Sequence, residues 1–104
     1  MITSIISLLL IQVQPIFSRD DYPAEALRRG LEGTVEVDII VTPQGRVGSC
    51  SVVVSSGSTS LDQGTCDLIT RRARYSPAKD EQGNPIEGRD HTKIRWVLPK
   101  RMSR

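Results

Sequence analysis

The chain is poor in aromatic residues and carries little net charge. Phe, Tyr and Trp make up 4% of its 104 residues and are scattered, so no platform for stacking nucleic-acid bases is visible. The net charge of +2 lies far below the strongly basic charge typical of nucleic-acid-binding domains. We therefore expect no nucleic-acid partner.

The sequence also lacks the residue groups that catalysis and metal binding require. One histidine, His91, cannot complete a three- or four-ligand metal site with only two cysteines, and no Cys-x-x-Cys pair is present. The serine-rich stretch SSGS has no Gly-x-Ser-x-Gly motif, and a single histidine beside a polar loop is a poor general base. We expect no enzymatic activity, no metal site and no cofactor.

Charged residues are missing altogether from residues 1–18. The apolar run from Ile2 to Ile11 falls short of the ~20 residues that span a bilayer, but its length suits the apolar region of a secretory signal. We expect an export signal here, although a basic start is missing and Ile16-Phe17-Ser18 is a weak cleavage site. A misassigned start or a short hydrophobic strand are the alternatives. The folded domain is expected over residues 20–99, followed by a basic tail over 100–104.

In the first half of this domain, the sequence predicts a helix followed by a β-hairpin. Pro23 before AEALRR predicts a short helix that glycines end, and the alternation in TVEVDIIV predicts a half-buried strand. The turn sequence TPQG follows, and a return strand is expected with Cys50, Val52 and Val54 on one face.

In the second half of the domain, the sequence predicts a helix, a loop and a last strand. A capping box from Ser60 to Gln63 places the start of the helix at Leu61, and DEQGNPIEG is expected to be a loop. The last strand is expected from Thr92 to Leu98, before Pro99. The order is that of an α+β domain in two layers, with a small three-stranded antiparallel sheet packed against two helices. The buried stripe of the second helix is expected to be Leu61, Thr65, Leu68, Ile69 and Ala73.

The two cysteines lie on different predicted elements. Cys50 is on the core side of its strand, and Cys66 lies in the helix that must cover that side. A structural disulfide between the layers is favoured, with two buried inert thiols as the alternative. Such a disulfide persists only in an oxidising compartment, which agrees with export to the periplasm.

Several motifs in combination resemble the C-terminal domain of TonB-type energy transducers. They are Tyr-Pro before the first helix, Gly-Thr-Val opening the first strand, Gly-Arg-Val after the turn, and Arg-x-Arg-Tyr-x-Pro after the second helix. The resemblance covers residue 21 to about residue 99. It implies a protein-interaction domain of the periplasm, which pairs an extended receptor peptide, the TonB box, with the last strand during energy-coupled transport across the outer membrane.

The resemblance also implies a site and partners. The partners are TonB-dependent outer-membrane receptors, together with inner-membrane motor proteins if an anchor precedes this sequence, in which case a longer form is attached to the inner membrane. The docking edge is the last strand, with the segment near Tyr22 beside it. The implied peptide-binding residues are Tyr22, His91, Thr92, Lys93, Ile94, Arg95, Trp96 and Val97.

The last strand suggests an open edge without reference to any family. No further strand follows it, so one side is expected to present free N–H and C=O groups for β-augmentation. The alternative is that Lys93 and Arg95 only protect the edge from aggregation. For Trp96 we expect packing under the helices, and the alternative is an exposed aromatic anchor for a ligand.

The sequence departs from the family in having no membrane-spanning helix and no proline-rich linker. Three roles are therefore expected: a truncated transducer, a free periplasmic binding module, or a TolA-like adapter domain of the cell envelope without energy transduction.

Overall fold

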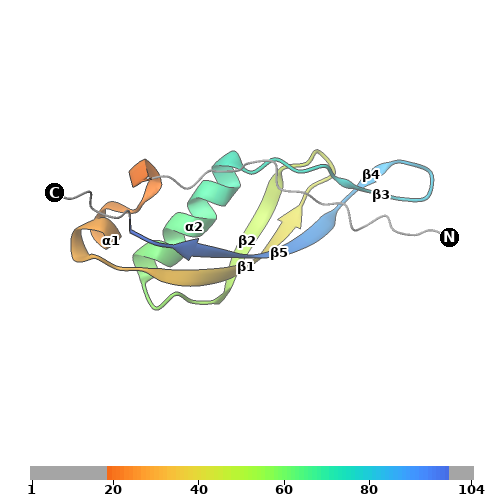
Figure 1. Cartoon of the computed structure of the whole chain (residues 1–104). Coiled ribbons are helices and arrows are strands. Elements are labelled where there is room, and N and C mark those ends of the chain that lie inside the picture. The colour runs from red at the N-terminus through yellow and green to blue at the C-terminus, as the bar shows by residue number, and fades with distance from the viewer. Residues whose placement is uncertain (1–18, 99–104) are drawn as a thin grey trace.

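A computed structural model describes residues 19–98, and it confirms the α+β fold with a three-stranded antiparallel sheet and two helices. The sheet order is β2-β1-β5, so β1 is central and β2 and β5 are the two edges. Helix α2 lies across one face of this sheet (Figure 1). The predicted leader, Pro99 and the basic tail lie outside the described residues. The elements are η2 (Arg19–Asp21, a 3-10 helix), α1 (Ala24–Arg29), β1 (Gly33–Val41), β2 (Val47–Val54), α2 (Thr59–Arg72), β3 (Ala78–Lys79), β4 (Pro85–Ile86) and β5 (Gly88–Trp96).

The core lies between the sheet and α2. Alternate residues of β1 are buried, as the period of two predicts, and they face the predicted stripe of α2. Burying one large aliphatic side chain stabilises a fold by about 1.5–3 kcal/mol, so the several aliphatic side chains buried between these layers contribute strongly to the stability of the fold. The buried residues are Val35, Val37, Ile39 and Val41 from β1, and Leu61, Thr65, Leu68 and Ile69 from α2, with Ala73 just after it.

Helix α2 begins at Thr59, so the predicted start at Leu61 is wrong. The N-cap is Ser58, whose side-chain oxygen accepts a hydrogen bond from the Leu61 N–H at 3.2 Å. Four serines lie near the start of this helix: Ser55, Ser56, Ser58 and Ser60. Ser56 instead bonds to the Asp62 carboxylate, which accepts from its N–H at 2.9 Å and its hydroxyl at 2.7 Å.

The predicted alternation along β2 is wrong at its end. The register with β1 shifts between Glu36 and Val37, so Val54 lies opposite Glu36 and Val53 has no partner of its own. Such a bulge inserts one residue and changes the face on which the following side chains lie. Val53 and Val54, at and after the bulge, are 48% and 49% exposed, and Val52, just before it, is 39% exposed.

The disulfide between Cys50 and Cys66 is confirmed, with the two Cα atoms 5.6 Å apart. It joins the edge strand β2 to α2. Within the described residues there is no free cysteine. Closing a loop of this length contributes about 3 kcal/mol in the chain-entropy model.

The expected loop DEQGNPIEG contains the short strand β4, which pairs with β3 just before the loop. The two strands project as a hairpin beyond the sheet (Figure 1). The Asp80 carboxylate accepts the backbone N–H groups of Gln82 and Asn84, both at 2.9 Å, and Gly83 takes φ +86°. Strand β5 begins just after this hairpin, so it starts at Gly88 rather than Thr92, and it ends at Trp96 rather than Leu98.

Candidate functional site

Strand β5 forms a long, regular edge of the sheet. All nine of its residues pair with β1 in one unbroken antiparallel register, from Trp96 opposite Gly33 to Gly88 opposite Val41. Within the described residues no strand lies on its other side. Every second residue of β5 therefore directs its backbone N–H and C=O away from the sheet.

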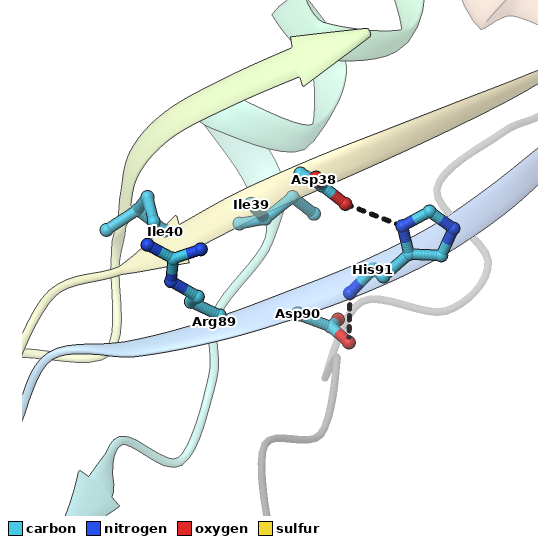
Figure 2. Close-up of a pocket in the computed structure, with 6 residues that line it drawn as sticks. All are labelled: Asp38, Ile39, Ile40, Arg89, Asp90 and His91. Atoms are coloured by element: carbon cyan, nitrogen blue, oxygen red, sulfur yellow. Dashed lines mark hydrogen bonds and ion pairs between the residues drawn. The ribbon is translucent and has the colours of Figure 1, made fainter. Parts of the chain in front are cut away.

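One contact shows which residues these are. The His91 N–H donates to the side-chain carboxylate of Asp90 at 2.9 Å, so it points away from β1 (Figure 2). Because these directions alternate along an antiparallel strand, the backbone groups of Lys93 and Arg95 also point outward. By the same alternation the Arg89 N–H points outward too, so Asp90 occupies the second outward donor of β5, and the donors of Lys93 and Arg95 lie beyond it.

The side chains of β5 divide between two faces. Asp90, Thr92 and Ile94 are half-buried on the helix side. The Asp90 carboxylate also accepts the Tyr75 hydroxyl at 3.1 Å. Burial of Tyr75, together with the charge of Asp90 and this hydrogen bond, raises the pKa of the phenol far above its ordinary value.

The opposite face of the sheet is open and charged, with a basic residue at every second position of β5. Next to them on β1 lie two carboxylates: Asp38 bonds to His91 Nδ1 at 2.5 Å, and Glu36 bonds to His91 Nε2 at 3.1 Å. Two hydrogen bonds raise the pKa of the His91 imidazole. The one to Asp38 has the larger effect, and the one to Glu36 the smaller. Lys93 Nζ lies 3.9 Å from Glu36. The basic residues are Arg89, His91, Lys93 and Arg95.

A hollow of about 450 Å³ lies at the start of this face. Figure 2 shows Arg89 extending beside Ile40, with His91 turned toward Asp38. The lining residues are Asp38, Ile39, Ile40, Arg89, Asp90 and His91.

Two of the expected peptide-binding side chains lie in the core. Trp96 is 2% exposed and donates its indole N–H to Thr65 Oγ1 at 2.7 Å. Tyr22, 7% exposed, donates its hydroxyl to the Leu31 carbonyl at 2.6 Å and meets the Trp96 ring edge-on, with centroids 5.1 Å apart. The expected packing of Trp96 under the helices is confirmed. Tyr22 lies beside the end of β5, but its ring packs against the protein interior.

The other expected residues lie along the edge, and the sequence reasoning missed some of their neighbours. His91, Thr92, Lys93, Ile94 and Arg95 are all on β5, and Val97 is exposed just after it. Arg89, Asp90 and the carboxylates of β1 were not proposed from the sequence. Basic residues occur at every second position from 89 to 95, and this alternation could have predicted that the strand already includes Arg89.

The second edge, β2, is irregular. Its register with β1 shifts again between Ile40 and Val41, so only residues 49–52 pair without interruption. A surface hollow of about 360 Å³ is lined by residues of this edge and of α2: the disulfide, Val52 and polar residues of the helix. Over residues 19–98 no group of three metal-ligating side chains suits a metal ion, and no helix is long and apolar enough to cross a membrane.

Comparisons with known proteins place this geometry in context. The family model described as the Gram-negative bacterial TonB protein C-terminal matches residues 18–98. Protein TonB of Vibrio cholerae serotype O1 is 37% identical over 87 residues, which cover 84% of this chain and 33% of that protein. Protein tonB2 of Pseudomonas aeruginosa is 41% identical over 59 residues, which cover 57% of this chain and 22% of that protein. The chain thus spans a third or less of these relatives.

A solved structure has the same fold. The solution NMR structure of the Pseudomonas aeruginosa TonB CTD matches with a TM-score of 0.67 over 92% of both chains, at 22% sequence identity. At that identity the match bears on the fold alone.

Proposed function

This chain belongs to the family of TonB C-terminal domains, and from that membership we propose that it binds the TonB-box peptides of outer-membrane receptors by strand addition along β5. The domain acts in the periplasm as a non-enzymatic module in energy-coupled transport. The docking edge runs from His91 to Val97.

The observation that carries the proposal is the regularity of β5. An added strand needs consecutive outward donors and acceptors at constant spacing, and a bulge interrupts that spacing. The register of β5 with β1 is unbroken along all nine residues, whereas β2 is interrupted near both ends. Of the two edges, β5 is the one that offers a continuous template.

The edge also accounts for how different receptors would be accepted. Backbone hydrogen bonds supply the affinity, and they are the same for any sequence. Side chains of the peptide lie beside Thr92 and Ile94 on the helix side, and beside the basic residues on the open face. Asp90 must release the His91 N–H for pairing to extend to the start of the edge, so we place the first contacts at Lys93 and Arg95.

The proposal is tested by removing single backbone donors. Lys93→Pro deletes an outward N–H while leaving alone the residues that bond to β1, so binding of a receptor TonB-box peptide should be lost. Lys93→Ala is the matched control, because it removes the charge and keeps the N–H. Its affinity should fall only modestly, since exposed ion pairs contribute about 0–1 kcal/mol. Affinities are measured by calorimetry.

A second measurement does not depend on whether the proline variant folds. In the unchanged protein, N-methylation of alternate peptide amides should abolish binding for one set of positions and leave it intact for the other. Equal binding by both methylated peptides, or by Lys93→Pro and Lys93→Ala, would contradict strand addition.

A further inference from the structure

The basic residues on the open face of β5 are not equivalent. The two central ones, His91 and Lys93, lie against the carboxylates of Glu36 and Asp38 on β1. The two outer ones, Arg89 and Arg95, are exposed, and no described carboxylate lies within ion-pair distance of either guanidinium. Positive charge is therefore uncompensated at the two ends of this face, six residues apart, and compensated between them.

We propose that β5 selects extended peptides that carry two acidic side chains six residues apart, one beside Arg89 and one beside Arg95. This inference rests on the proposed function and specifies the chemistry of the peptide. Six residues of extended chain span about 20 Å, in the peptide as in β5 between Arg89 and Arg95. In one register, therefore, each acidic side chain lies beside one of the two arginines. Opposite charges on adjacent strands stabilise pairing, and like charges destabilise it.

The separation of the two acidic side chains must be an even number of residues for both to lie on one face of the strand. Side chains alternate between faces, so two acids six residues apart lie on the same face, and two acids five residues apart cannot. With a spacing of five, one acid still meets an arginine, but the other falls on the helix side. There it lies beside Asp90, a like charge, or beside Ile94, an apolar side chain.

The same charges also protect the edge, and this does not conflict with selection. Basic residues along an edge repel a second copy of the same strand, because like charges then lie on adjacent strands. An acidic strand is attracted by the same residues. The occupant is thus a peptide with acids at the two ends of the paired segment and neutral residues where β1 already compensates the charge.

Two peptides of identical composition test the spacing. The first is Asp-Val-Thr-Val-Thr-Val-Asp, with acids six residues apart, and the second is Asp-Val-Thr-Val-Thr-Asp-Val, with acids five apart. At low salt the first should bind about fivefold more tightly, the effect of one favourable cross-strand charge pair. The preference should shrink in high salt, which screens exposed charges.

Charge reversal identifies the residues responsible. Arg89→Glu combined with Arg95→Glu should abolish the preference, and it should favour a peptide with Lys in place of both Asp residues. Arg46→Glu combined with Arg71→Glu is the matched control: it changes the net charge equally, on exposed residues away from β5, and should keep the preference. Fluorescence of the buried Trp96 reports whether each variant is folded.

The remaining outcomes separate this inference from the proposed function. Equal binding of both peptides, together with loss of binding in Lys93→Pro, would overturn the acidic spacing and leave strand addition intact. Failure of every peptide, the receptor TonB-box peptide included, would overturn both. Equal peptide binding together with capture of phosphatidylserine vesicles that depends on Arg89 and Arg95 would assign the arginines to a membrane surface and overturn the inference.

Discussion

The two edges of the sheet differ in almost every property that governs pairing with another strand. β5 keeps one register with β1 over nine residues and carries a basic side chain at every second position of its open face. β2 is shorter, shifts register near both ends, exposes Val52–Val54, and is tied to α2 by the disulfide. One edge is regular and charged, and the other is irregular and apolar.

The difference shows two ways of preventing unwanted association. Bulges disrupt the spacing of the outward backbone groups, so β2 offers an added strand only the short regular stretch of residues 49–52, despite its exposed valines. Charges leave that spacing intact and exclude only strands of the wrong charge. β5 therefore remains open to a chosen partner, and the comparison predicts that the two edges respond differently to the same perturbations.

The largest effect is expected where β5 ends in the core. Trp96→Ala removes a buried ring that contacts Tyr22 and Thr65, and should lower the free energy of unfolding by about 3–5 kcal/mol. Trp96→Phe keeps most of the ring and loses the indole N–H, so its loss should be smaller. Urea denaturation measures both, and an unchanged midpoint for Trp96→Ala would show that the ring does not anchor this edge.

Removing the disulfide should affect the β2 edge and leave the β5 edge alone. Replacing Cys50 and Cys66 together by Ser should lower the free energy of unfolding by about 3 kcal/mol, within the usual 2–5 for small secreted domains. Peptide affinity measured under folding conditions should not change, because β5 lies on the far side of β1. A stable double variant that no longer binds would contradict the independence of the edges.

The smallest effect concerns pH and the open face. His91 gains Asp38 and Glu36 as partners only in the fold, and Arg89 and Lys93 flank it on β5. The pKa of the imidazole is raised, so the protonated form stabilises the fold. This stabilisation is complete below pH about 6.5 and is lost as pH rises through the pKa of the folded state. An NMR titration of the imidazole checks this, and a folded-state pKa below 6.5 would refute it.

Much of the fold could be predicted because single strong patterns determine it. The alternation in β1 and the apolar stripe of α2 each leave one way to bury their residues, and the two cysteines lie on elements that must face each other. The bulge at Val53 could not be predicted, since a period of two is assumed in reading a strand. The start of α2 was missed because Ser58 and Ser60 are chemically equivalent as caps.

The candidate site was predictable as a segment and not as a set of side chains. The position of the last strand led to residues 91–97 as the predicted binding segment, and this stays a prediction. The side chains of Trp96 and Tyr22 are buried in the core. The hydrogen bond from the His91 N–H to the Asp90 carboxylate forms because this N–H points away from β1. No sequence pattern shows which backbone groups of a strand point away from its neighbour. Arg89 was missed because Gly88 was read as part of a loop.

The most direct test of the difference between the edges is a map of backbone amide shifts. The protein, labelled with ¹⁵N, is titrated with a receptor TonB-box peptide, and shifts are followed at both edges. We expect the largest shifts at Lys93 and Arg95, further shifts along residues 91–97, small shifts near Tyr22, and none along residues 49–54 of β2. Shifts concentrated on β2, or on α2 around Arg71 and Arg72 with β5 unchanged, would contradict this expectation.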